Sequence, residues 1–263
     1  MLVFAAFTPH SPLLLPSINK TQMDKVEKTT SAMQELADEL YASHPDVIVH
    51  ISEHPTIYPD AFSINLSDPY KFDLSSLGDL GITRTFRPDI MLIDRLQRSL
   101  RAESQPITLT TDYALHYASA VPLLLLTKEL PNVQLVPISF SELPPKDHFH
   151  FGQALKDMIF ASDKRIAVIA SGDMSHALTS NAPADFHKDG QIYDDKIQEI
   201  IAQRNSAGLL SLSPEIVANA KETSYLPLAI FFGLLDKVSM TPQILSYEAP
   251  FGVGYLTVNF VLK

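Results

Sequence analysis

Side chains that bind metals or transfer protons follow four predicted strands, at the point where each strand ends. His10 follows the first strand, His54 the second, Asp173 and His176 a later one, and Glu248 one near the carboxyl terminus. In open α/β sheets ligands bind outside the carboxyl ends of the strands, because the connecting loops converge there. We therefore expect these five side chains to meet at one edge of a sheet.

Three of these residues have the chemistry of an iron site. Two imidazoles and one carboxylate form the facial set that holds ferrous iron and leaves positions open for substrate and oxygen, and His10, His54 and Glu248 supply such a set. Each residue alone also fits an ordinary role: His10 as a turn cap beside two prolines, His54 as a surface-loop residue, and Glu248 as a solvated carboxylate. Their wide spacing matches no short motif, so the iron site is a hypothesis.

The segment Ser171–Gly172–Asp173–Met174–Ser175–His176 is a second candidate for chemistry. Small polar residues directly after a buried strand leave backbone and side chains free to face a ligand, so Asp173 and Ser175 are predicted to bind substrate. Two alternatives stay open: Asp173 as a cap of the next segment only, and Ser171 or Ser175 with His176 as the nucleophile and base of a hydrolase.

The remaining histidines are expected to have structural or surface roles. His50 lies within a predicted strand and should pack or form a hydrogen bond there. His148 and His150 stand near the start of a predicted helix and should be exposed, as should His187 in a loop. His44 falls at the end of a helix, where a partly cationic imidazole suits the helix dipole.

Hydrophobic periodicity places strands and helices in alternation along the chain. Short apolar runs bounded by turn residues predict strands, and apolar residues spaced three or four apart predict helices. Strands are expected near 2–7, 46–52, 108–111, 133–140, 165–170, 243–247 and 253–262, and helices near 26–40, 88–100, 119–130, 149–161 and 192–201. This order predicts a layered α/β/α fold with a mostly parallel, mixed sheet, helices on both faces, and an antiparallel carboxyl-terminal pair.

Length and composition predict one globular domain over residues 1–263. The hydrophobic fraction is 46% and the charged fraction 19%, a balance typical of folded proteins. No repeat or long linker divides the chain, and the stretch 68–87, rich in Ser, Gly and Asp, is the main excursion, either a lid or a surface loop. The loop interpretation is the more common one.

Composition also excludes several classes of function. The sequence has no cysteine, which excludes disulfides, iron–sulfur clusters, thiolate zinc sites and cysteine nucleophiles. A formal net charge of −10 without a basic cluster disfavours nucleic acid and anionic membranes as partners. No apolar stretch reaches the roughly 20 residues of a membrane span, and no secretory signal is recognisable, so a cytoplasmic location is expected.

Four sequence motifs resemble one known family. They are Pro9–His10–Ser11–Pro12–Leu13, Ile51–Ser52–Glu53–His54–Pro55, the Ser171–His176 segment, and Ser246–Tyr247–Glu248–Ala249–Pro250–Phe251–Gly252–Val253–Gly254–Tyr255. Together they resemble the class III extradiol ring-cleavage dioxygenases of the LigB type, from the first strand to the last. Within that superfamily the chain most resembles the amino-terminal domain of AmmeMemoRadiSam system protein A, which an AMMECR-type domain usually follows; this sequence ends at Lys263.

The resemblance implies a role for each matching residue. The family's histidine ligands fall on His10 and His54, and its glutamate ligand falls on Glu248. The acid–base histidine beside the substrate falls on His176. A further family histidine matches His116 only with a shift of one residue, because Leu115–His116–Tyr117–Ala118 replaces the usual Asp-His-Gly stretch.

The implied activity is ring opening of a catechol-type diol by O2 at Fe2+, with Zn2+ as the metal that purification could leave in the site. His176 would transfer protons, with His116 second. Two alternatives remain on the same fold: a Memo-like metal- or peptide-binding protein without turnover, and a zinc-dependent hydrolase. The expected partners are therefore a small aromatic diol and O2, and a homodimer is expected from the resemblance alone.

Overall fold

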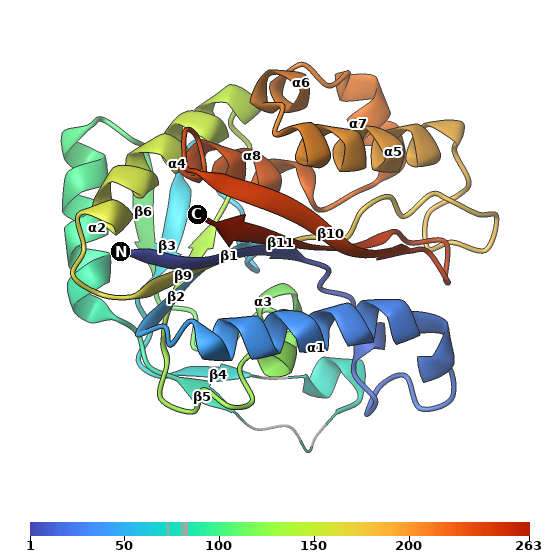
Figure 1. Cartoon of the computed structure of the whole chain (residues 1–263), viewed down its shortest axis with the longest axis horizontal. Helices are drawn as coiled ribbons and strands as arrows, with labels where there is room; N and C mark the ends of the chain where they lie inside the picture. Colours follow the sequence, from blue (N-terminus) through green and yellow to red (C-terminus); the bar gives the residue numbers. More distant parts are fainter. Residues whose placement is uncertain (73, 80, 82–83) are drawn as a thin grey trace.

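The computed structural model describes residues 1–72, 74–79, 81 and 84–263. Strands and helices alternate along most of this length (Figure 1). The strands are β1 Leu2–Thr8, β2 Val47–Ser52, β3 Phe62–Asn65, β4 Tyr70–Phe72, β5 Thr85–Phe86, β6 Ile107–Thr110, β7 Ala114–Leu115, β8 Gln134–Ser139, β9 Ile166–Ser171, β10 Met240–Glu248 and β11 Tyr255–Leu262. The α-helices are α1 Glu27–Ala42, α2 Ile90–Ala102, α3 Tyr117–Leu126, α4 Pro145–Phe160, α5 Lys188–Gln203, α6 Ser206–Leu210, α7 Pro214–Ala220 and α8 Tyr225–Leu234.

The main sheet has eight strands in the order β10-β11-β1-β9-β2-β8-β3-β6. Strands β1, β9, β2 and β8 are mutually parallel, β11 is antiparallel to β1, and β10 is antiparallel to β11. The predicted mixed sheet and its antiparallel carboxyl-terminal pair are therefore confirmed. A third antiparallel pairing, between β3 and β8, was not predicted. Because β10 is parallel to β1, the carboxyl ends of β1, β2, β9 and β10 lie at the same edge.

Alternate residues of the central strands face two separate cores, as expected for a sheet buried on both faces. One core packs Phe7, Val49 and Val168 against helices α2, α4, α5, α6 and α8. The other packs Ala6 and Ile48 against α1, α3 and the small strands β4, β5 and β7. The helices thus lie on both sides of the sheet (Figure 1), which confirms the predicted three layers.

Helices α4 and α8 approach so closely that only glycine fits at their contact. A Cβ atom at Gly152 would lie 1.9 Å from the carbonyl oxygen of Ile230, and one at Gly233 would lie 2.0 Å from that of Phe149. Helix α8 is apolar on all sides and buried, as a helix packed between the sheet and α4 must be. The contact determines where α8 begins, and so places the residues just before Tyr225.

Replacing Gly152 with alanine is therefore expected to destabilise the protein strongly. The added methyl group must push the two helix backbones apart, at a cost of about 3 kcal/mol, or a fall in Tm of roughly 6–10 °C. Gly81→Ala is the matched control, because a Cβ there meets its nearest atom at 3.6 Å. Thermal unfolding of both variants by circular dichroism measures the difference, and equal Tm values would contradict the close contact.

Two sequence predictions need correction. His148 is fully buried, not exposed: its ring nitrogens lie 3.0 Å from the carbonyl oxygen of Pro144 and 3.1 Å from that of Ser141, and its edge packs on Phe62. The stretch 68–87 contains β4 and β5, which join β7 in a three-stranded sheet. Residues 73, 80, 82 and 83 of that stretch lie outside the described residues. Among the helices that the structure describes, none is long and apolar enough to cross a membrane.

Candidate metal centre

Three neighbouring strands, β1, β9 and β2, carry candidate residues just beyond their carboxyl ends. His10 is the second residue after β1, Asp173 the second after β9, and His54 the second after β2. All three are at least 95% buried. The sheet thus brings together residues that are more than 40 positions apart in the chain, as predicted from the strand-end rule.

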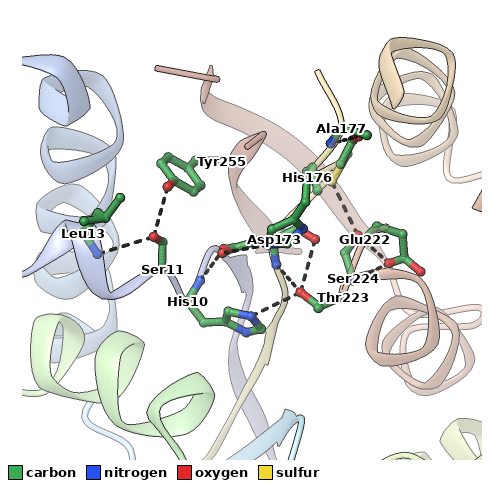
Figure 2. Close-up of polar contacts among 12 residues, drawn as sticks. His10, Ser11, Leu13, Asp173, His176, Ala177, Glu222, Thr223, Ser224 and Tyr255 are labelled. Atoms are coloured by element: carbon green, nitrogen blue, oxygen red, sulfur yellow. Dashed lines mark hydrogen bonds and ion pairs between the residues drawn. The ribbon is translucent and has the colours of Figure 1, made fainter. Parts of the chain in front are cut away.

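His10 is held at its backbone and at one ring nitrogen. Its backbone N–H donates to Oδ1 of Asp173 at 2.9 Å, and Nε2 lies 3.1 Å from Oγ1 of Thr223 (Figure 2). The ring meets the edge of Tyr117 at a centroid distance of 5.8 Å. Nδ1 is buried and has no hydrogen-bond partner among the described residues. A buried, oriented ring nitrogen without a partner is what a metal ligand looks like before the metal binds.

His54 and His50 form a second pair of imidazoles at this edge. Nε2 of each ring is buried and unpartnered. Nδ1 of His50 lies 3.2 Å from Oγ of Ser119, which is 2.6 Å from Oγ of Ser52, so the expected hydrogen bond of His50 inside its strand is present. Burial lowers the pKa of His50, and the nearby rings of His54 and His10 add to this effect.

His116 belongs to the same group of imidazoles. It immediately precedes helix α3, and its ring packs on Tyr117 with centroids 4.3 Å apart. Its Nδ1 is buried and unpartnered, and the ring acts electrostatically on His54 and is itself acted on by His10. The structure therefore brings His116 to the site despite the one-residue shift from the family motif.

The loop after β9 carries Asp173 and His176 toward the same place. Nε2 of His176 lies 4.0 Å from Oδ2 of Asp173, and Nδ1 of His176 is buried without a partner. Burial raises the pKa of Asp173 to about 6, against the opposing effects of the His10 N–H and of His176. Asp173 therefore anchors the backbone of His10 and stands beside the ring of His176.

Ser175, in contrast, already has protein partners for its hydroxyl and its backbone N–H. Its hydroxyl is fully buried, donates to the carbonyl oxygen of Ala220 at 2.9 Å and accepts from the N–H of Ala177 at 3.0 Å. Its backbone N–H donates to Asp194 at 2.8 Å. These bonds shape the loop, and a contact between Ser175 and substrate stays a prediction.

Glu248 lies at the end of β10, at the same edge, and is held by helix α1. Its Oε1 accepts from the backbone N–H of Thr29 at 2.8 Å and from the Thr29 hydroxyl at 2.6 Å. A carboxylate is stabilised there because the first turn of a helix leaves its N–H groups unpaired. Between Glu248 and β1 stands Tyr255, whose hydroxyl lies 3.0 Å from Oγ of Ser11.

Burial keeps His10, His54 and His116 neutral at physiological pH. Burial, with a smaller effect of His176, lowers the pKa of His10 to about 3; burial likewise is the main cause that lowers the pKa values of His54 and His116 to about 4. A neutral imidazole has a lone pair on one ring nitrogen, and that lone pair is what binds a metal. The site is thus in the protonation state that a metal requires.

The imidazole nitrogens of the site are suitable ligands for a divalent metal, but no three described ligands are yet arranged around one point. Across the described residues, no three His, Asp or Glu side chains lie in an arrangement that would hold a metal ion. Five histidines at this edge each have one buried ring nitrogen without a hydrogen-bond partner among the described residues: His10, His50, His54, His116 and His176. Since buried polar atoms nearly always have a partner, five exceptions at one edge indicate a binding role.

Sequence analysis missed two residues of the site. Tyr117 packs on both His10 and His116, and its position directly after His116 at a helix start was the available signal. Thr223 contacts His10 across 213 positions of sequence. Nothing in the sequence marks that contact, because it depends on where α8 packs.

Comparison with known proteins agrees with this fold. Residues 4–258 match the family model described as the catalytic LigB subunit of aromatic ring-opening dioxygenase. The Protein CA_C1420 of Clostridium acetobutylicum is 23% identical over 256 residues, which cover 94% of this chain and 55% of that protein. The chain thus spans about half the length of this curated relative.

A solved structure has the same fold. The crystal structure of uncharacterized protein JW3007 from Escherichia coli K12 superposes with a TM-score of 0.66 at 18% identity, over 98% of this chain and 99% of that one. A match over nearly the whole chain places it in a family, and the chain belongs to the LigB family of dioxygenase-type proteins.

Proposed function

We propose that this chain is a non-haem iron(II) extradiol dioxygenase, a single LigB-type domain that opens the ring of a catechol-type substrate with O2. The observation that carries the proposal is the group of buried, unpartnered imidazole nitrogens on His10, His54, His116 and His176. Family membership supports an oxidoreductase of the ring-opening type. Neither property alone names the reaction, but iron is the metal that joins histidine ligation to oxygen chemistry.

His10 and His54 would hold the metal, with Glu248 as the third ligand. Thr29 occupies only Oε1 of Glu248, so Oε2 is the oxygen that remains for a metal. Hydrogen bonds to one oxygen of a ligating carboxylate are common, since they orient the group. When bound, ferrous iron would supply Lewis acidity and a template for the diol and O2.

The protein's own acid–base group in this proposal is His176. Its unpartnered Nδ1 would accept the proton of a substrate hydroxyl and return it after ring opening. The carboxylate of Asp173, 4.0 Å from Nε2, would stabilise the ring while it carries the positive charge. Tyr117, packed between His10 and His116, would bound the substrate position and exclude water. His116 would be the second proton carrier.

Anaerobic reconstitution with ferrous iron, followed by catechol and air, tests the proposal. A yellow ring-fission product together with oxygen uptake is the expected result. Stoichiometric iron binding without turnover would contradict dioxygenase activity and support a binding protein. Zinc retention with ester or amide cleavage would contradict it in favour of a hydrolase.

The pH dependence of metal retention is a separate prediction. Because burial lowers the pKa of His10 to about 3 and of His54 to about 4, both rings stay neutral down to about pH 5. Protons then compete with the metal only below about pH 4, whereas an ordinary imidazole begins to lose metal near pH 6.5. We expect the iron content after desalting at pH 5.5 to equal that at pH 7.5. Metal loss centred near pH 6.5, with an unchanged circular dichroism spectrum, would contradict this prediction.

A further inference from the structure

Thr223 is placed between the His10 ring and the backbone of Asp173 (Figure 2). Its Oγ1 accepts from the N–H of Asp173 at 2.9 Å, lies 3.1 Å from Nε2 of His10, and lies 3.4 Å from the carbonyl oxygen of Asp173. Its backbone N–H donates to that same carbonyl at 3.0 Å. One residue thus joins the loop after β9 to the first imidazole of the site.

The position of Thr223 is imposed by the structure around it. The next residues, Ser224 and Tyr225, donate their N–H groups to the carboxylate of Glu222, which also accepts from the hydroxyl of Tyr193 on α5. The backbone of Gly172 lies against the same segment, since a Cβ there would be 2.5 Å from Cα of Ser224 and 2.6 Å from the carbonyl oxygen of Thr223. A hydroxyl held this firmly can orient a ring.

The hydrogen-bond pattern distinguishes the two neutral forms of His10. If Nε2 carries the proton, it donates to Oγ1 of Thr223, the Thr223 hydroxyl donates to the carbonyl of Asp173, and Nδ1 keeps a free lone pair. If the Thr223 hydroxyl donates to Nε2 instead, Nδ1–H becomes a buried donor without a partner. Nδ1 has no hydrogen-bond partner among the described residues in either form, but only the first form leaves it a lone pair that a metal can occupy, so metal binding favours the first arrangement.

We infer that Thr223 is a positioning residue that keeps the proton of His10 on Nε2 and thereby presents Nδ1 to the metal. The identity of the metal in this inference rests on the proposed function. The position of the proton on the His10 ring does not. Metal-binding histidines typically donate their other ring N–H to such a partner, and loss of that partner weakens metal binding about 10–100-fold.

Thr223→Val tests this inference, because valine keeps the shape of threonine and lacks the hydroxyl. Titration calorimetry with ferrous ion under anaerobic conditions, and separately with Zn2+, should show binding about 10–100-fold weaker than in the wild type. Thr223→Ser retains the hydroxyl and should stay within about threefold of the wild type, since the same partner remains. Thr127→Val is the matched control, since Thr127 is also fully buried and its hydroxyl donates only to Leu123 in α3.

Nitrogen-15 NMR of the metal-free wild type gives an independent readout. The ring of His10 should show a protonated Nε2 and an unprotonated Nδ1. A proton on Nδ1 would overturn the inference, as would wild-type metal affinity in Thr223→Val, even if that variant had a lower Tm. If the wild type bound neither metal, the proposed function would fail, while the NMR result would still decide the role of Thr223.

Discussion

Replacing His10 or His54 with alanine is expected to abolish stoichiometric binding of ferrous iron. Each substitution removes one of two buried neutral imidazoles, each of which has one ring nitrogen without a partner among the described residues. Loss of a direct ligand should exceed the roughly 10–100-fold effect of losing an outer partner, so the Kd should rise by at least about 100-fold. Iron content after anaerobic reconstitution and desalting, with calorimetry for the Kd, measures the effect.

The control for both variants is His150→Ala, which removes an exposed histidine from helix α4. It should bind one iron per chain with the affinity of the wild type. Circular dichroism must show that the His10 and His54 variants remain folded, because both side chains are buried. Full iron occupancy in a folded His54→Ala protein would contradict the proposed ligand set.

Replacing His176 with alanine is expected to leave iron binding intact and to lower kcat by about 10²–10⁴-fold, the usual contribution of a positioned acid–base group. His176 is less buried than His10, and its nearest charged neighbour is Asp173 at 4.0 Å. Oxygen uptake with catechol as substrate, on protein with a measured iron content, is the assay.

The same measurements separate the two roles assigned to histidines in this site. If His176→Ala lost its iron, His176 would be a ligand, and the division between ligand and proton carrier would be wrong. If it kept both iron and turnover, the proton would have to pass through another group, and His116→Ala would be the next variant to measure. The exposed His150→Ala variant again controls for loss of a histidine.

Much of the fold could be predicted from hydrophobic pattern alone. Strands such as Val47–Ser52 and Ile166–Ser171 are uniformly buried, so their continuous apolar runs indicate a sheet covered on both faces. Helix Tyr225–Leu234 was missed because it is apolar on every side and has no periodicity to read. The strand Ile107–Thr110 was predicted near 108–111, but shorter strands such as Ala114–Leu115 were missed, since so short a segment leaves no pattern.

The site was predictable where it depended on strand ends and not where it depended on packing. His10, His54 and Asp173 follow adjacent parallel strands, so the strand-end rule brought them together correctly. Glu248 reaches the same edge, yet its bonds to Thr29 arise from the docking of α1, which no local pattern reveals. The structural role of Ser175 was equally invisible, because its partner at Ala220 lies 45 positions away.

The order of the strands affects how the protein takes up a metal ion. Backbone pairing between β1, β9 and β2 sets His10, Asp173 and His54 at one edge through contacts of the protein alone. Small metallodomains such as zinc fingers collapse only around their metal, because they have too little else to bury. Here two hydrophobic cores assemble the receptor beforehand. A chelator should accordingly remove the metal without unfolding the protein, and added metal should fill the site again. Which of two competing cations occupies the site then depends on their concentrations and not on refolding.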